Sequence, residues 1–305
     1  MHSVVSQSFI SVILFTDICF MMSYQQQLIL LIKNALTEDI GDGDHSTLST
    51  IDPYAKGTAV LKSKEDGVLA GMEVAKTIFR FMENSAVFNA NKKDGEEMKK
   101  GDMIFEVKAR VHTILQCERL ALNCMQRMSG IATLTRMFTD KLQGYHTKVL
   151  DTRKTTPNFR LLEKEAVRIG GGLNHRMGLY DMIMLKDNHI DYCGGLEKAI
   201  DKAYYYVQTK KTGLKIEVET RNLDDVKKVV KIAKGKVFRI MLDNFSPSLI
   251  REALLIIDGK FETEASGGIN LDNVISYAET GVDYVSIGGL IHQARSLDLN
   301  LKAVL

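Results

Sequence analysis

Basic side chains flank short apolar runs at two places in the sequence. They are His175, Arg176 and Lys186 in HRMGLYDMIMLKDNH, and Arg153 and Lys154 in KVLDTRKTTP. Five cation-capable groups in one site would repel one another without an anionic partner, and guanidinium groups suit carboxylates or phosphates. The pattern predicts a pocket for strongly anionic small molecules. The alternative is a solvated basic rim.

Carboxylates end two further apolar runs. Glu219 closes IEVE and Asp243 closes RIMLD. Because successive strand residues point to opposite faces, Glu217 shares a face with Glu219. Carboxylates beside a cationic pocket can hold sugar hydroxyls, bind a hydrated Mg²⁺ or stabilise a cationic transition state. The alternative is that they form buried structural ion pairs.

Glycine-rich turns follow the last two apolar runs, in EASGG and VSIGG. The residues concerned are Ser266, Gly267, Gly268, Gly288 and Gly289. Glycine allows backbone N–H groups to approach an anion, and parallel barrels commonly bind phosphate after their final two strands. Two such turns at these positions predict a phosphate site.

The apolar runs recur with the spacing of strand–helix units. The residues that follow successive runs are Lys154, Lys186, Glu219, Asp243, Ser266 and Gly288, which lie 22 to 33 residues apart. A strand and its crossover helix need about 20 to 30 residues, and regular alternation indicates a parallel sheet. Six units predict an incomplete (β/α) barrel, with Ser246 as the cap of one helix and Pro247 as its first residue. An open doubly wound sheet is the weaker alternative because no GxGxxG follows the first strand.

The first half of the chain has a different pattern, typical of an α+β domain. We expect helices at 27–36 and 72–82, strands at 58–64 and 103–109, and a helix from 112 to 142 that is interrupted near Ser129-Gly130.

Composition excludes some classes of protein. The 305 residues include 40 basic and 38 acidic side chains, so the net charge of +2 argues against nucleic-acid binding. The four cysteines form no CxxC pair, which indicates a reduced, cytoplasmic protein. His189 and Cys193 have the spacing of two zinc ligands, but no second pair completes a site.

The first 22 residues are apolar but lack the features of a signal peptide. No Lys or Arg precedes Lys33, and the apolar run contains Asp17 and is too short for a bilayer of roughly 30 Å. We expect no membrane segment here, and interpret residues 1–22 as an extension that is disordered or not translated.

Several sequence blocks resemble the quinolinate phosphoribosyltransferase family. The blocks are DTRKTTP, EAVRIGGGLNHRMGLYDMIMLKDNH, MLDNFSP, EASGGIN and VSIGGLIHQARSLDLNLK, with EDIGDGD, KEDGVLAG and ERLALNCMQRMSGIATLT in the first half. The resemblance covers residues 24–305. It implies that quinolinate and 5-phosphoribosyl-1-pyrophosphate (PRPP) give nicotinate mononucleotide, pyrophosphate and CO₂ in NAD biosynthesis, with Mg²⁺ bound to PRPP.

The resemblance also implies an architecture. After the extension, an open α/β sandwich domain would span 23–130, an incomplete α/β barrel with seven strands 131–290, and a tail returning to the first domain 291–305. The basic unit would be a homodimer with shared active sites, which could assemble further into hexamers.

Roles follow from the matching motifs. Around quinolinate the resemblance places Arg153, His175, Arg176 and Lys186, with Arg119 reaching across from the partner subunit. On the PRPP side it places Lys154, Glu219, Asp243, Ser266, Gly267, Gly268, Gly288, Gly289 and His292. Thr155 is also predicted to bind substrate. Of these, Lys154, Lys186, Glu219 and Asp243 are predicted to be catalytic, and none is assigned as a direct ligand of Mg²⁺.

Three alternatives remain at this point. A phosphoribosyltransferase of the same fold could act on nicotinate without decarboxylation, but one carboxylate needs fewer cations. The dicarboxylate is favoured by the set Arg119, Arg153, His175 and Arg176. A related group of proteins is associated with molybdenum transport genes. A catalytically silent barrel could sense PRPP or a dicarboxylate, but such a sensor would not need Lys186, Glu219 and Asp243.

Overall fold

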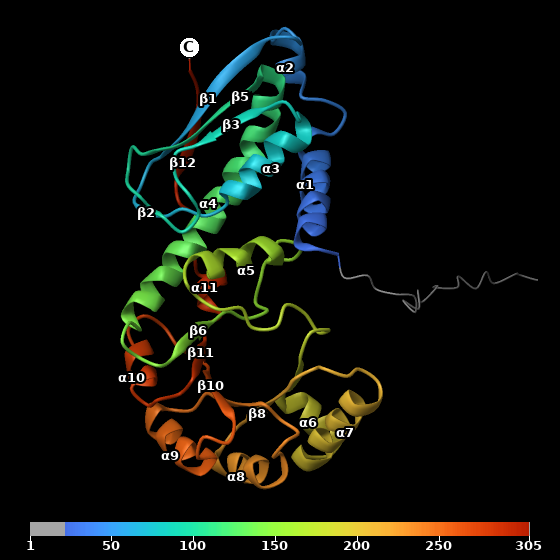
Figure 1. The fold of residues 1–305 in the computed structure, drawn as a ribbon, viewed down its shortest axis with the longest axis vertical. Helices are drawn as coiled ribbons and strands as arrows, with labels where there is room; N and C mark the ends of the chain where they lie inside the picture. Colours follow the sequence, from blue (N-terminus) through green and yellow to red (C-terminus); the bar gives the residue numbers. More distant parts are fainter. Residues whose placement is uncertain (1–21, 305) are drawn as a thin grey trace, which may run out of the picture.

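A computed structural model describes residues 22–304, so the expectation for the N-terminal extension lies almost wholly outside the described residues. The chain forms an N-terminal domain and a barrel domain, and the long helix α4 (Val111–Lys141) runs from one into the other (Figure 1). No helix within residues 22–304 combines the length and the apolar character needed to cross a membrane.

The N-terminal domain is built on an antiparallel sheet with strand order β12-β1-β5-β3. Strand β5 alternates buried and exposed side chains along much of its length, as expected for a sheet with one face in the core. Helix α4 packs along this sheet, and α1 and α3 pack against α4. The elements are α1 (Tyr24–Ile40), α2 (His45–Thr50), β1 (Lys56–Ser63), β2 (Gly67–Val68), α3 (Met72–Met82), β3 (Val87–Ala90), β4 (Glu97–Met98) and β5 (Met103–Arg110).

The C-terminal residues belong to the N-terminal sheet. Strand β12 (Leu299–Val304) pairs antiparallel with β1, from Thr58 opposite Val304 to Ser63 opposite Leu299. The chain therefore leaves the barrel after α11 (Gly289–His292) and returns to the first domain.

The barrel domain contains a parallel sheet with strand order β6-β11-β10-β9-β8-β7, and its helices lie outside the sheet (Figure 1). The predicted fold class is confirmed. The elements are β6 (Lys148–Leu150), α5 (Arg160–Ile169), β7 (Ile183–Leu185), α6 (Asp187–Cys193), α7 (Leu196–Thr209), β8 (Ile216–Thr220), α8 (Leu223–Ile232), β9 (Arg239–Asp243), α9 (Pro247–Ile257), β10 (Glu262–Ser266), α10 (Val274–Ala278) and β11 (Tyr284–Ser286).

Two details of the barrel bear on the predictions. Ser246 caps α9 by accepting a hydrogen bond from the Leu249 N–H, and Pro247 is the first helical residue, as predicted. The seven strands implied by the resemblance are reduced to six, because the expected additional strand is represented by one isolated parallel bridge between Leu150 and Leu173.

The predicted interruption of α4 at Ser129-Gly130 is wrong. The helix is continuous through both residues. A Cβ built on Gly130 would lie 1.9 Å from the Arg295 carbonyl oxygen, so glycine is there to admit the returning C-terminal chain. The Ser129 hydroxyl bonds with the backbone of Ala70, donating to its carbonyl and accepting from its N–H. Both residues serve packing between segments rather than helix termination.

Candidate active site

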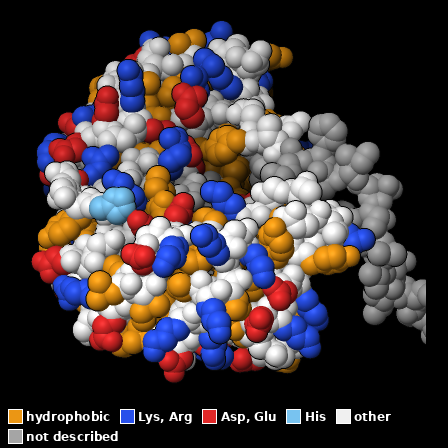
Figure 2. All heavy atoms as spheres, turned by 60° about the horizontal axis from the view of Figure 1, so that its bottom comes forward, with side chains coloured by type: hydrophobic (Ala, Val, Ile, Leu, Met, Phe, Trp, Pro, Cys, Tyr) orange, Lys and Arg blue, Asp and Glu red, His pale blue; other side chains and the backbone are white. Residues whose placement is uncertain are grey.

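A cavity of about 900 Å³ opens at the carboxyl ends of the parallel strands. This is the edge where loops converge in parallel barrels. Figure 2 shows basic, acidic and histidine side chains around a hollow in the molecular surface. The predicted site residues that line the cavity are Arg153, Lys154, His175, Arg176, Lys186, Glu219, Asp243, Ser266, Gly267, Gly268, Gly288, Gly289 and His292. The predicted convergence of these loops is therefore observed.

Two predicted site residues do not line this cavity. The Thr155 hydroxyl accepts a hydrogen bond from Arg160 Nε at 2.9 Å, which directs it toward α5. Arg119 is exposed on α4, in the N-terminal domain. Within one chain, Arg119 contributes nothing to the cavity wall.

Two guanidinium groups lie close together in the wall. Burial and the neighbouring Arg153 both lower the pKa of Arg176 from its ordinary value. Arg176 Nη1 donates to the Met182 carbonyl at 3.2 Å. Arg153 Nε is buried and finds no acceptor within residues 22–304. A buried charged N–H without an acceptor is costly, so the site is suited to an anion that would accept from it.

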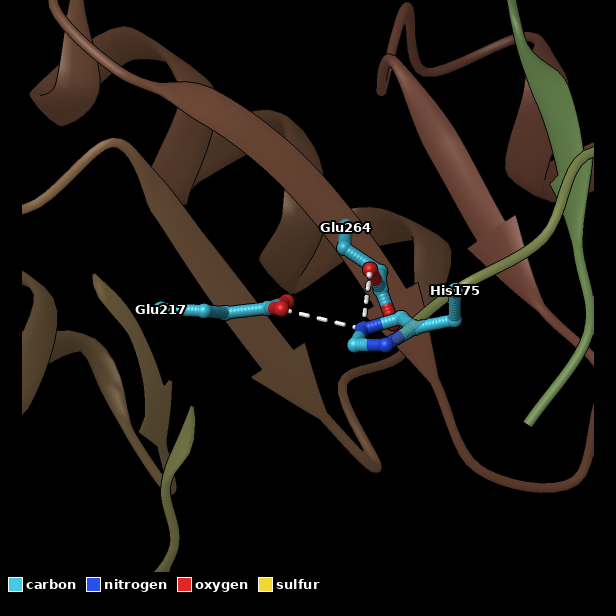
Figure 3. Close-up of side chains that lie close together, drawn as sticks. All are labelled: His175, Glu217 and Glu264. Atoms are coloured by element: carbon cyan, nitrogen blue, oxygen red, sulfur yellow. Dashed lines mark ion pairs between the residues drawn. The ribbon is translucent and has the colours of Figure 1, made fainter. Parts of the chain in front are cut away.

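His175 lies among buried charged groups (Figure 3). Its Nε2 is 2.9 Å from Glu217 Oε2 and 3.4 Å from Glu264 Oε2, and both glutamates are fully buried. These contacts are ion pairs that lack the alignment of hydrogen bonds. Arg239 Nη1 donates to Glu264 Oε2 at 3.0 Å from the other side. Because Glu217 precedes Glu219 on β8, the cluster lies deeper in the barrel than the rim carboxylates.

The protonation of His175 is set by its neighbours. Burial opposes charge on the ring, but Glu217 and Glu264 outweigh it and raise the pKa of His175 to about 9. Burial, together with Glu264, raises the pKa of Glu217 to about 7. The Arg176 N–H donates to His175 Nδ1 at 2.7 Å, which places the ring proton on Nε2. Since a second ring proton would displace that N–H, we assign the additional proton to the His175–Glu217 pair as a unit.

The rim carboxylates Glu219 and Asp243 influence each other. Burial and the nearby Asp243 carboxylate raise the pKa of Glu219, while the Asp187 N–H and Lys186 oppose this rise. Asp243 accepts a hydrogen bond from the Asn244 side chain at 2.7 Å. Two carboxylates at the mouth of a cavity favour a bound cation or several hydroxyl groups.

The glycine turns after β10 and β11 contribute backbone to the wall, beside Asp243 and Lys154. Gly267 has φ +102°, and a Cβ there would lie 2.1 Å from Asn244 Oδ1, so only glycine fits. A Cβ on Gly288 would lie 2.9 Å from Lys154 Cδ, which shows that the Lys154 side chain crosses this turn. Lysine and exposed turn backbone are therefore adjacent, as a phosphate site requires.

Two groups of residues could be considered for metal binding. His175, Glu217 and Glu264 place potential ligand atoms within 4.8 Å of one another. Arg239 and the His175–Glu217 proton already balance these carboxylates, so we interpret this group as an ion-pair cluster. Glu219 and Asp243 instead fit Mg²⁺, which takes oxygen ligands and retains water.

Several residues of the cavity wall were not among those predicted from the sequence. Glu264 and Ser286 line the wall and were not predicted. Glu264 lies two residues before Ser266 on β10, so the same strand alternation that relates Glu217 to Glu219 could have identified it. No comparable signal in the sequence marks Gln293.

An incomplete parallel barrel whose mouth combines cations, carboxylates and glycine turns is typical of enzymes acting on anionic, phosphorylated small molecules. Comparisons define the class further. The family model "Quinolinate phosphoribosyl transferase, N-terminal domain" matches residues 44–129, and the C-terminal domain model matches residues 131–302. The chain belongs to the quinolinate phosphoribosyltransferase family.

Individual relatives agree with this assignment. The chain is 42% identical over 285 residues to quinolinate phosphoribosyltransferase [decarboxylating] 1b of Nicotiana tabacum, covering 89% of this chain and 81% of the relative. It is 39% identical to a probable nicotinate-nucleotide pyrophosphorylase [carboxylating] of Bacillus subtilis, covering 92% and 94%. The crystal structure of NadC from Streptococcus pyogenes superposes with a TM-score of 0.84 at 39% identity, covering 92% of this chain and 98% of that one.

Proposed function

We propose that this protein transfers the phosphoribosyl group of PRPP to quinolinate and releases CO₂ and pyrophosphate, which gives nicotinate mononucleotide. The observation that supports this most directly is the cavity wall. Arg153 and Arg176 lie close together there, and Arg153 Nε is buried without an acceptor in the described chain. Quinolinate, with two adjacent carboxylates, supplies acceptors for both guanidinium groups.

The remaining wall residues divide between the two substrates. We assign Arg153, His175, Arg176 and Lys186 to quinolinate. Lys154 and the turn at Gly288 would hold the pyrophosphate of PRPP, and Gly267 would provide backbone for its phosphate. Glu219 and Asp243 would hold the ribose hydroxyls.

The chemistry follows from this division. As pyrophosphate leaves, ribose C1 acquires positive charge, and carboxylates below the ribose stabilise it while Lys154 stabilises the leaving group. Holding both substrates in one cavity makes attack by the pyridine nitrogen effectively intramolecular, which can contribute about 7–11 kcal/mol. Once the nitrogen is ribosylated, its positive charge stabilises the electron pair left on the adjacent ring carbon when CO₂ departs, and a proton from solvent then takes the place of CO₂ on that carbon. Decarboxylation therefore comes second.

Mg²⁺ is part of this proposal. Glu219 and Asp243, the two carboxylates at the rim of the cavity, would hold the ion. When bound with PRPP, Mg²⁺ neutralises charge on the pyrophosphate leaving group.

We also propose a homodimer in which Arg119 completes the partner's quinolinate site. A second hollow, of about 1130 Å³, is lined partly by Leu30, Leu31, Phe159 and Leu120, the residue that follows Arg119 on α4. Leu30 is 47% exposed. Exposed apolar surface of this kind supports a protein interface at this place.

A cytoplasmic location is the final part of the proposal. Cys117, Cys124 and Cys193 are free thiols, which is usual for a reducing compartment. The related nicotinate-nucleotide pyrophosphorylase of Arabidopsis thaliana is chloroplastic and a related Nicotiana tabacum enzyme is mitochondrial, so localisation varies among the relatives. Fractionation of the native cells tests this assignment.

Product analysis tests the proposed reaction. Purified protein with Mg²⁺ and PRPP is given quinolinate or nicotinate, and nucleotide products are separated by chromatography. The proposal expects nicotinate mononucleotide from quinolinate and little from nicotinate. Efficient turnover of nicotinate without turnover of quinolinate would contradict it.

A further inference from the structure

Helix α5 contains two adjacent charged residues that have no exposed surface, Glu163 and Lys164. Glu163 accepts hydrogen bonds from Arg127 and from the backbone and hydroxyl of Thr156. Lys164 points instead toward the barrel, to the end of β6. A fully buried ammonium group is very unfavourable unless it is paired, so its partners show what it does.

Lys164 and Asp151 form a buried ion pair around the backbone of His175. Lys164 Nζ contacts Asp151 Oδ1 and also donates to the His175 carbonyl at 3.0 Å. Asp151 Oδ1 accepts the His175 N–H at 2.8 Å. Both backbone polar groups of one cavity residue are thus bound by one ion pair. With its amide oriented to satisfy both partners, Asn174 also donates to Asp151 Oδ2, at 2.8 Å.

This arrangement lies where the parallel sheet is incomplete. Beyond β6 the only strand-like contact of the described chain is the bridge between Leu150 and Leu173. His175 lies two residues after Leu173. Its backbone N–H and carbonyl make no hydrogen bonds to a neighbouring strand within residues 22–304, although His175 is only 8% exposed. A buried backbone group without a partner is strongly disfavoured. The ion pair supplies the bonds that a further strand would have supplied.

Stability alone does not account for such a pair. The cost of burying two charges offsets most of their attraction, and apolar replacements are often equally stable. Burial raises the pKa of Asp151 to about 6 despite Lys164, which reflects that cost. The residues held are His175 and, next to it, Arg176, both in the cavity wall.

We propose that Asp151 and Lys164 are positioning residues for quinolinate: their ion pair, here termed the His175 clamp, fixes the segment 173–176 and so places His175 and Arg176 for the dicarboxylate. The inference rests on the proposed function for the identity of the ligand. It predicts that disturbing the clamp affects quinolinate binding far more than PRPP binding, because the clamp binds the backbone of His175, whereas the PRPP groups other than Lys154 lie on the loops after β8 to β11.

The test uses Lys164→Met, Asp151→Asn and the combined Asp151→Asn/Lys164→Met variant of the full chain. The control is Lys236→Met, which removes a half-buried surface lysine from its ion pair with Asp201. The KM for quinolinate, the KM for PRPP and kcat are measured for each. Hydrogen–deuterium exchange of peptides covering 173–176 is measured without substrates.

In the single variants we expect the quinolinate KM to rise roughly tenfold or more, with the PRPP KM changed less than about twofold. Amide exchange should accelerate in 173–176 and remain unchanged in β8–β10. Lys236→Met should have the same KM values, kcat and amide exchange as the unaltered protein. The combined variant removes both charges, so it leaves no unpaired buried charge and replaces the single variants if these do not fold. We expect the same result for it: a raised quinolinate KM and a nearly unchanged PRPP KM.

Equal changes in both KM values, or an unchanged quinolinate KM in a folded clamp variant, would overturn the proposal. If the unaltered protein does not turn over quinolinate, the proposed function fails and the clamp is judged by exchange alone. Faster exchange confined to 173–176 would then support the clamp, and unchanged exchange there would refute it.

Discussion

Nε2 of His175 lies 2.9 Å from Oε2 of Glu217, below the rim of the cavity. The pair links barrel strand β8 to the segment that contains Arg176. Because Glu264 and Glu217 raise the pKa of His175 against the effect of burial, the folded protein binds a proton here more tightly than the unfolded chain does.

The His175–Glu217 pair should make stability depend on pH. The His175 pKa rises from an ordinary 6.5 to about 9 on folding, so its contribution is complete below pH 6.5 and is lost as pH rises through 9. We expect the free energy of unfolding to fall by on the order of 2–3 kcal/mol across this interval. Urea titrations at pH 6.5 and 9 measure it.

The variant Glu217→Gln should weaken this dependence, because the neutral amide removes one of the two carboxylates that raise the pKa of His175 and leaves Glu264 alone. The exposed Glu252 on α9 provides the control Glu252→Gln, which should retain the full dependence. An identical pH dependence in Glu217→Gln and the control would show that the pair does not share the proton.

Arg176 should contribute to the binding of quinolinate and not to the binding of PRPP. A charge-assisted hydrogen bond contributes about 1.5–3 kcal/mol, so Arg176→Gln should raise the quinolinate KM roughly 10- to 100-fold and leave the PRPP KM nearly unchanged. The exposed Arg251 allows the matched control Arg251→Gln. Steady-state kinetics with each substrate varied separately give both constants. A change confined to the PRPP KM would reverse our division of the cavity.

Arg119 should act in the partner's site. Arg119→Ala and Lys186→Ala subunits should each be nearly inactive alone, since each lacks one part of every shared site. Mixed dimers should regain part of the activity, at most about one quarter of that of the unaltered protein with random pairing. Activity is measured after subunit exchange has been verified by mass spectrometry of tagged chains. Absent recovery in verified mixed dimers would indicate self-contained sites.

The variant Gly130→Ala tests whether the C-terminal chain packs directly against α4 at this position. Helix propensity alone predicts that Gly130→Ala stabilises the protein by about 1 kcal/mol. Since a Cβ would lie 1.9 Å from the Arg295 carbonyl oxygen, we expect destabilisation by about 1–3 kcal/mol instead. Asn123→Ala, at an exposed position of the same helix, is the control. Thermal unfolding of both variants measures the change in stability. A Gly130→Ala protein more stable than the unaltered protein would contradict the close approach of the Arg295 backbone to α4.

The contrast between Gly130 and Glu219 shows how far the sequence can predict the structure. The barrel strands could be predicted from local apolar runs. Because the strands are parallel, the polar residues at their carboxyl ends lie at the same edge of the sheet. Glu219 and Asp243 could therefore be assigned to the cavity from sequence. Gly130 depends on Arg295, 165 residues further along the chain, and local pattern contains no information on such a contact.

The buried Lys164 illustrates the same limit within the site. In RLLEKEAVRI it follows Glu163 and precedes Glu165, which is the composition of a solvated helix face. Its burial results from Asp151 and His175, which approach it only in the folded barrel. Residues that line the cavity could be predicted by type and strand position, whereas the buried partners of their backbone could not.

The most direct test of the account is the fate of the carboxylate next to the ring nitrogen of quinolinate. Purified protein is incubated with Mg²⁺ and quinolinate labelled at that carboxylate, with and without PRPP, and released CO₂ is trapped and counted. We predict release only with PRPP, in equal amounts with nicotinate mononucleotide. Release without PRPP, or nucleotide that retains the label, would contradict a site in which ribosylation precedes decarboxylation.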